Sequence, residues 1–119
     1  MSRTAVMLHD DAKDVSRVER LLAGHRLRLL RCEQVGELEQ LLTTCRECLV
    51  LLNLEINGVD NELLRRVSKA CDQVQIIGIS RRPYHPELEQ ALRSHLRAVI
   101  ARPIDDDELT LCLRGAMDL

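Results

Sequence analysis

Aromatic residues are nearly absent from this chain of 119 residues: Tyr84 is the only one, and there is no Trp or Phe. Proteins that bind single-stranded nucleic acid by stacking need flat side chains, so this mode of recognition is excluded. The chain also lacks an excess of positive charge, because its formal net charge is -2 and its pI about 6.1. Proteins that bind the phosphate backbone of nucleic acid without regard to its sequence need such an excess. We therefore expect no direct binding of nucleic acid.

Long hydrophobic runs are missing as well. The first apolar run ends at Leu8, and His9, Asp10 and Asp11 follow it, so it is too short for the apolar region of a signal peptide. No run approaches the roughly 20 apolar residues that cross a bilayer. The five cysteines are an odd number scattered among apolar residues, unlike the even pairing of a disulfide framework. These features predict a cytoplasmic protein without membrane contact.

The length and composition that remain are those of one folded domain. At 119 residues, 45% hydrophobic and 30% charged, the chain can bury a core without metal or disulfide support. We expect a single domain over residues 1–119.

Five apolar runs alternate with five helical patterns. The runs cover residues 4–8, 26–32, 49–54, 74–79 and 98–101. Asp60 is the expected N-cap of the third helix, and Pro86 the first residue of a fourth helix that runs to Leu96. Asp105 and Glu108 have the spacing of a capping pair for the fifth. Right-handed crossovers turn this alternation into a parallel sheet with helices on both faces.

Ligands of such sheets gather at the carboxyl ends of the strands. The residues at these ends are Asp10 and Asp11 after the first run, Asn53 in the third, Ser80 after the fourth and Arg102 after the fifth. They form the candidate functional site.

Order and spacing of these residues resemble the receiver domains of two-component response regulators over nearly the whole chain. Asp10 and Asp11 stand where receivers carry an acidic pair, Ser80 where they carry Ser or Thr, and Arg102-Pro103 where they carry Lys-Pro. Residues 52–58 read Leu-Asn-Leu-Glu-Ile-Asn-Gly, in the place of the usual Leu-Asp-Leu-x-Met-Pro-Gly. The resemblance implies an α/β, flavodoxin-like (βα)5 fold, doubly wound, with a parallel five-stranded sheet in the order 2-1-3-4-5.

The resemblance also implies roles for the strand-end residues. In receivers the middle aspartate attacks a phosphoryl group, the acidic pair helps to hold Mg²⁺, and the hydroxyl and lysine side chains contact the phosphoryl oxygens. Asn53 replaces that aspartate here, and a neutral amide is a poor nucleophile. We therefore expect a chain that is not phosphorylated at Asn53 and is not an enzyme. Without a phosphoryl group, Ser80 is interpreted as a hydroxyl that ends a strand.

Replacement of the aspartate also affects metal binding, because Mg²⁺ prefers clustered carboxylate oxygens. We expect no required cofactor, with Asp11 and the Glu55 carbonyl left as weak Mg²⁺ ligands in the positions that the resemblance implies. Arg102 replaces the lysine and carries a permanent charge in a planar fork. It is expected to pair with Asp10 or Asp11.

These expectations indicate a protein-interaction module of bacterial signalling or transcriptional control. In the resembled family the fourth helix, fifth strand and fifth helix form the surface for dimers and output domains. The corresponding residues here are apolar or of both charges: Leu88, Leu92, Leu96, Ile100, Ile104, Arg93, Arg97, Asp105, Asp106 and Asp107. A two-fold interface needs such a self-complementary surface, which favours a homodimer. The other expected partner is a separate protein or an attached output domain, as in sigma-54-dependent activators.

Two alternatives stay open at this point. A receiver could still take a phosphoryl group or a metal through Asp10 or Asp11. A small-ligand sensor could instead bind an anion or a nucleotide at Arg81, Arg82 and Arg102.

Cys45 and Cys48 form a C-x-x-C motif. Redox motifs of this kind open a helix, whereas Cys45 is expected to close one and Cys48 to begin a strand. A zinc site would need a second pair of ligands, which the sequence lacks. The motif is therefore interpreted as structural, and His9 as a hydrogen-bonded histidine of the core or its rim.

Overall fold

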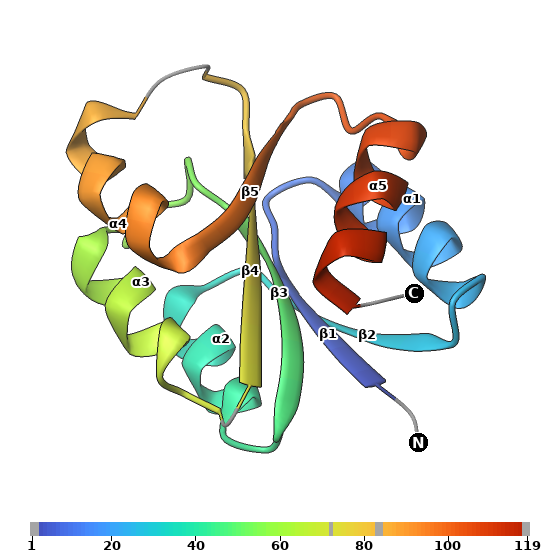
Figure 1. Ribbon diagram of the computed structural model, residues 1–119, viewed down its shortest axis with the longest axis horizontal. Coiled ribbons are helices and arrows are strands. Elements are labelled where there is room, and N and C mark those ends of the chain that lie inside the picture. The colour runs from blue at the N-terminus through green and yellow to red at the C-terminus, as the bar shows by residue number, and fades with distance from the viewer. Residues whose placement is uncertain (1–2, 72, 83–84, 118–119) are drawn as a thin grey trace.

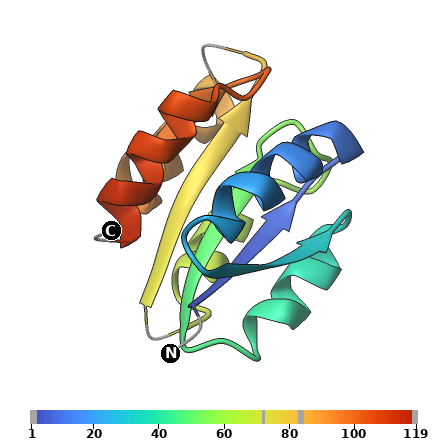
Figure 2. The same ribbon diagram turned by 90° about the vertical axis from the view of Figure 1, so that its right-hand side faces the viewer.

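A parallel sheet of five strands forms the centre of the molecule. The computed structural model describes residues 3–71, 73–82 and 85–117. The strands are β1 (Arg3–Leu8), β2 (Leu27–Cys32), β3 (Glu47–Asn53), β4 (Gln73–Ser80) and β5 (Leu96–Ala101). All neighbouring pairs are parallel, in the order β2-β1-β3-β4-β5, and Figure 2 shows the strands pointing the same way. The predicted fold class is confirmed.

Helices cover both faces of this sheet. They are α1 (Ala12–Ala23), α2 (Val35–Leu42), α3 (Asn61–Ser68), α4 (Glu89–His95) and α5 (Asp106–Met117), with a 3-10 turn η1 (Pro86–Leu88) before α4. Helices α1 and α5 lie on one face, and α2, α3 and α4 on the other (Figure 1). In the described part of the chain, none of the helices combines the length and the apolar character that crossing a membrane requires.

The central strand β3 is buried on both faces, as its continuous apolar run predicts. Leu49 and Leu51 belong to the core under α1 and α5, and Val50 and Leu52 to the core under α2 and α3. This alternation follows from the two-residue period of a strand. The same period puts Asn53, the last residue of β3, on the face that carries Leu49 and Leu51, at the carboxyl end of the strand.

Side-chain caps fix where the helices begin. Asp60 accepts a hydrogen bond from the Leu63 backbone at 2.8 Å, and Asp105 accepts one from the Glu108 backbone at 2.9 Å. Both caps were expected from the sequence. Asp11 caps α1 in the same way, through the Lys13 backbone at 2.9 Å.

The segment after β4 corrects two predictions. Pro86 opens a 3-10 turn rather than the first turn of an α-helix, and α4 ends at His95. Leu96, expected on that helix, instead begins β5 and pairs with Ile76, where the register shifts before it continues with Ala98. A leucine suits a buried helix face and a strand equally, so its apolar character alone did not fix the boundary.

The expected interaction surface needs a correction as well. Leu88, Ile100 and Ile104 are buried in the two cores, so they cannot form a surface for a partner. Among the residues whose exposure the structure describes, the large apolar ones that are exposed are Val99 on β5 and Leu111 on α5, at 44% and 68% of their full exposure. Successive side chains of a strand point to opposite faces of the sheet, which explains why Val99 is exposed while Ile100 is buried. The side chains of Leu92 and Arg93 lie outside the described residues.

Candidate functional site

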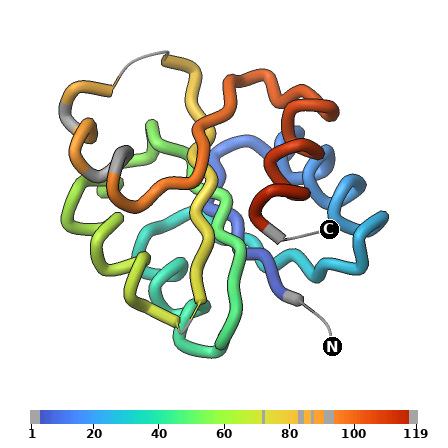
Figure 3. Tube along the Cα trace, viewed as in Figure 1, coloured from blue at the N-terminus to red at the C-terminus, as the bar shows by residue number. Residues whose placement is uncertain are grey.

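Loops at the carboxyl ends of the strands gather at one edge of the sheet, as the chain trace in Figure 3 shows. Asp10 and Asp11 follow β1, Asn53 and Ser80 end β3 and β4, and Arg102 follows β5. The candidate residues come together because the ends of parallel strands share an edge. They separate into two groups of contacts.

The first group, which we call the acidic cluster, consists of Arg102 with Asp10, Asp11 and Asp14, together with Asn53. The Arg102 Nη2 atom lies 2.8 Å from an Asp14 carboxylate oxygen, 3.3 Å from one of Asp10 and 3.7 Å from one of Asp11. Its side chain is only 4% exposed. One guanidinium therefore offsets the mutual repulsion of three carboxylates.

Local structure positions both sides of this cluster. The Arg102 backbone N–H donates to the Ser80 carbonyl at 3.0 Å, and the following Arg102–Pro103 peptide bond is cis. Asp11 is fixed as the N-cap of α1, and Asp14 lies in the first turn of that helix. The cluster thus connects the end of β5 to the start of α1.

Asn53 uses both ends of its amide. Its Nδ2 atom donates to Asp10 Oδ1 at 2.8 Å, and its Oδ1 atom accepts from the Glu55 backbone N–H at 3.0 Å. Asn53 is buried. A carboxylate could accept from Glu55 but could not donate to Asp10, so this pair of contacts is specific for an amide.

The donor set of the acidic cluster does not fit a divalent cation. Mg²⁺ would bind the carboxylate oxygens of Asp10 and Asp11, but these oxygens face the Arg102 guanidinium, which would repel the metal. Asn53 contributes an amide N–H toward Asp10 instead of a further anionic oxygen. Among the described residues, no group of three or more His, Cys, Asp or Glu side chains is arranged to hold a metal ion.

The second group, which we call the loop cluster, consists of Glu55, Ser80, Arg82 and His85. The Ser80 hydroxyl donates to Glu55 Oε2 at 2.7 Å and accepts from the Arg82 backbone N–H at 3.0 Å. The other Glu55 oxygen accepts from the Arg81 backbone N–H at 2.7 Å. The Glu55 carboxylate therefore ties the loop after β3 to the loop after β4.

Ser80 and His85 are in direct hydrogen-bond contact, which raises the question of a nucleophilic serine. Arg82 Nη2 lies 2.7 Å from His85 Nδ1. A guanidinium only donates, so Nδ1 accepts and the proton is on Nε2, facing Ser80. Histidine activates a serine by accepting its proton, and an Nε2 atom that already carries one cannot do so. This geometry does not activate the Ser80 hydroxyl.

The arginines expected to receive an anion lie beside the loop cluster. Arg81 and Arg82 are exposed, their backbone N–H groups bind Glu55 and Ser80, and the Arg82 side chain contacts His85. These contacts belong to the loop cluster, whereas Arg102 pairs with the carboxylates of the acidic cluster.

His9 is buried and lies apart from both clusters. Its backbone N–H donates to the Cys32 carbonyl at 3.0 Å, and its Nδ1 atom has no hydrogen-bond partner among the described residues. With the ends of β2 and the starts of α1 and α2, it lines a cavity of about 380 Å³. The interpretation as a histidine of the core or its rim fits this place, and the Nδ1 atom does not make the expected hydrogen bond among the described residues.

Sequence reasoning missed Asp14 and His85. Asp14 lies three residues after the N-cap Asp11, and this spacing brings the two side chains to the same face of a helix, so helical periodicity could have found it. His85 reaches Ser80 through the path of a loop, for which the sequence carries no comparable signal. The Glu55 side chain, rather than its carbonyl, makes the contacts of the loop cluster.

Comparisons with known proteins agree on the fold. No protein-family model matches the chain, and no curated protein matches it. Among solved structures, the signal receiver domain of an HD domain-containing protein from Pseudomonas fluorescens is 21% identical with a TM-score of 0.85, covering 99% of this chain and 96% of that one. A response regulator from Thermotoga maritima is 13% identical with a TM-score of 0.85, and all of both chains is covered.

A third similar structure is the receiver domain of a sensor histidine kinase from Pseudomonas aeruginosa, which has a magnesium ion coordinated in its active site cleft. It is 15% identical with a TM-score of 0.79, and all of both chains is covered. The resemblance to receivers found in the sequence is confirmed at the level of the fold, which this chain shares with these receiver domains.

Proposed function

We propose that this chain is a non-phosphorylatable receiver domain that forms one unit over residues 1–119 and acts in the cytoplasm as a protein-interaction module. It serves bacterial signal transduction or transcriptional regulation and performs no catalysis. The observation that carries this proposal is the Asn53 amide, which holds Asp10 and the Glu55 backbone at the end of the central strand.

The chemistry of Asn53 supports the absence of phosphorylation. An acyl phosphate forms when an ionised carboxylate oxygen attacks phosphorus. The amide oxygen of Asn53 carries no such charge, and it already accepts a hydrogen bond from Glu55. The amide nitrogen donates to Asp10, which keeps the amide in this orientation.

The charge of Arg102 supports a pocket that is complete without ligands. The Pseudomonas aeruginosa neighbour holds magnesium in its cleft. In this chain a guanidinium, which stays charged at every physiological pH, lies against Asp10, Asp11 and Asp14. The positive charge that a metal would supply is part of the chain.

The surface of α4, β5 and α5 supports binding of a second copy or an output domain. Val99 and Leu111 are exposed there, although single exposed apolar residues are common on monomers. Arg97 lies over α5, with its guanidinium beside Gly115, and Asp106 and Asp107 are exposed at the start of the same helix. Apolar residues and charges of both signs are available to a self-complementary interface.

Treatment with acetyl phosphate and Mg²⁺, followed by intact-mass measurement, tests the proposal. We expect no phosphoryl adduct on the wild-type chain, and a receiver that has the acceptor aspartate serves as the positive control. An adduct that Asp10→Asn or Asp11→Asn abolishes would overturn the proposal in favour of phosphorylation through the acidic pair.

A further inference from the structure

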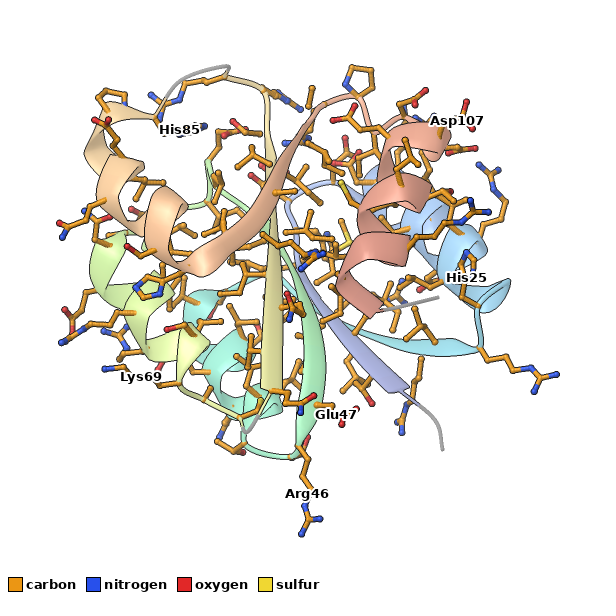
Figure 4. The ribbon with its side chains drawn as sticks, viewed as in Figure 1. His25, Arg46, Glu47, Lys69, His85 and Asp107 are labelled. Carbon is orange, nitrogen blue, oxygen red and sulfur yellow. The ribbon has the colours of Figure 1, made fainter. Side chains whose placement is uncertain are left out.

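Three of the five cysteines meet at the end of the sheet opposite the two clusters. Cys45 lies in the connection between α2 and β3, Cys48 is the second residue of β3, and Cys71 lies between α3 and β4. The labelled residues Arg46 and Glu47, which separate Cys45 from Cys48, lie at the opposite end of the molecule from His85 in Figure 4. The sequence motif contains only Cys45 and Cys48, and the fold adds Cys71.

The register of the sheet places the segments before β3 and β4 side by side. Glu47 pairs with Gln73 across β3 and β4, and the Gln73 backbone N–H donates to the Arg46 carbonyl at 3.1 Å. Cys45 and Cys71 each come two residues before this pair. They therefore lie in the segments that enter two neighbouring strands, and such strands are about 4.8 Å apart.

Both thiols also reach the same end of α2. Cys45 Sγ donates to the Leu41 carbonyl at 3.7 Å, and Cys71 Sγ donates to the Leu42 carbonyl at 3.5 Å. These carbonyls belong to consecutive residues of the last helical turn.

Exposure separates the three thiols. Cys45 and Cys71 are half-buried, whereas Cys48 is buried in the core under α2 and α3. Burial raises the pKa of the Cys48 thiol, and the neighbouring Cys45 and Cys71 raise it further. Thiolates are the reactive form, so Cys48 is the least reactive of the three.

From this arrangement we infer that Cys45 and Cys71 form a redox-sensitive site, at which hydrogen peroxide produces a reversible disulfide while Cys48 stays reduced. The Cys45 thiolate attacks one peroxide oxygen, the O–O bond breaks, hydroxide leaves, and a sulfenic acid forms. The Cys71 thiolate then attacks that sulfur, the S–S bond forms, and the S–O bond breaks with loss of a second hydroxide. Both sulfurs are oxidised, the peroxide is reduced, and two protons complete two water molecules. This site is independent of the proposed function.

Peptide mapping of the oxidised full chain tests the inference. Trypsin cleaves after Arg31, Arg46, Arg65, Lys69 and Arg81 and thereby separates Cys45, Cys48 and Cys71 onto peptides 32–46, 47–65 and 70–81. The reduced protein is treated with hydrogen peroxide, its remaining thiols are alkylated under denaturing conditions, and it is digested without reductant. We expect an intact mass lower by two hydrogen atoms, a bond between peptides 32–46 and 70–81, and an alkylated Cys48.

Substitutions assign the bond to single residues. Cys45→Ser and Cys71→Ser should each abolish it. Cys32→Ser should retain it, which settles the ambiguity that peptide 32–46 contains both Cys32 and Cys45. Cys112→Ser, on α5, is the matched control for a half-buried cysteine and should also retain it. Dithiothreitol should restore the reduced mass.

Other linkages overturn the inference. A bond between peptides 32–46 and 47–65, a bond through Cys112, or only unbridged sulfinic and sulfonic acids would each do so. If a substituted chain fails to fold, fragment spectra of the linked wild-type peptides decide the matter, because they show which of Cys32 and Cys45 carries the alkyl group.

Discussion

The Arg102 guanidinium lies 2.8 Å from the Asp14 carboxylate, a shorter distance than those to Asp10 and Asp11. Asp14 is also the least exposed of the three carboxylates, at 14% for its side chain. An ion pair that is shielded from water is screened less than one at the surface. This contact therefore contributes more to the acidic cluster than the two longer ones.

Arg102→Met should destabilise the chain by roughly 1–3 kcal/mol, because three neighbouring carboxylates lose their common cation while the aliphatic part of the side chain is kept. Urea denaturation at neutral pH measures the change. Arg20→Met is the matched control, since the Arg20–Asp106 pair is exposed on both sides and spans 3.4 Å. Surface pairs contribute about 0–1 kcal/mol. Equal losses in the two variants would contradict a structural role of Arg102.

Asn53→Asp tests whether Arg102 closes the pocket to metal. The new carboxylate would lie where the amide now donates to Asp10 at 2.8 Å, so we expect lower stability without a metal. Added Mg²⁺ should restore little in this variant and much more in Asn53→Asp/Arg102→Met. A cation at a hundred times its Kd adds about 2.7 kcal/mol, which thermal denaturation detects. An equal Mg²⁺ response of the single and double variants would show that Arg102 does not exclude the metal.

Glu55→Gln should destabilise the chain by about 1–2 kcal/mol. The carboxylate accepts hydrogen bonds from the Ser80 hydroxyl and the Arg81 backbone, and an amide retains only one acceptor oxygen. Glu47→Gln, at the exposed start of β3, makes the same chemical change without these contacts and should be neutral. Chemical denaturation compares the two variants. A neutral Glu55→Gln would mean that the loop cluster is held by its other contacts.

The buried thiol of Cys32 should react slowly with iodoacetamide in the native protein. Burial, and to a smaller extent the negative charge of Glu37, raises the pKa of Cys32 to about 12. The protonated form therefore persists as pH rises, and the native labelling rate should climb about tenfold per pH unit from pH 7 to 9 without levelling off. Mass spectrometry of labelled peptides measures this rate, with unfolded protein as the control. A plateau near the usual thiol pKa would contradict it.

Leu111→Ser should weaken any homodimer formed through α5 and leave stability nearly unchanged, because this leucine is 68% exposed. Light scattering over a concentration series measures the association. A substitution in the core, such as Val18→Ser, is not a useful control for association. Thr110→Ser, on the same helix, is a better control and should leave association unchanged. A wild-type chain that stays monomeric at high concentration would contradict the proposed homodimer.

Much of the fold could be predicted because its main strand is buried on both faces. Residues 49–54 are almost continuously apolar, which is typical of a central parallel strand, and the caps Asp60 and Asp105 indicated where helices begin. The boundary at Leu96 could not be predicted, because the shift in register between β4 and β5 is a tertiary feature.

The strand-end residues of the site could be predicted for the same reason, since a parallel sheet brings them to one edge. Asp14 does not lie at a strand end, because it belongs to the first turn of α1, and the strand pattern therefore does not point to it. The segments that contain Cys45 and Cys71 lie side by side because β3 pairs with β4, and the positions of the cysteines in the sequence do not reveal this pairing.

A cation that is covalently part of the chain cannot be chelated, exchanged or hydrolysed away. The charge balance at the end of β1 therefore stays constant when the cell's supply of magnesium or of high-energy phosphate changes. The signal of a protein that works in this way depends on how much of the protein and of its partner is present. Synthesis and degradation set these amounts.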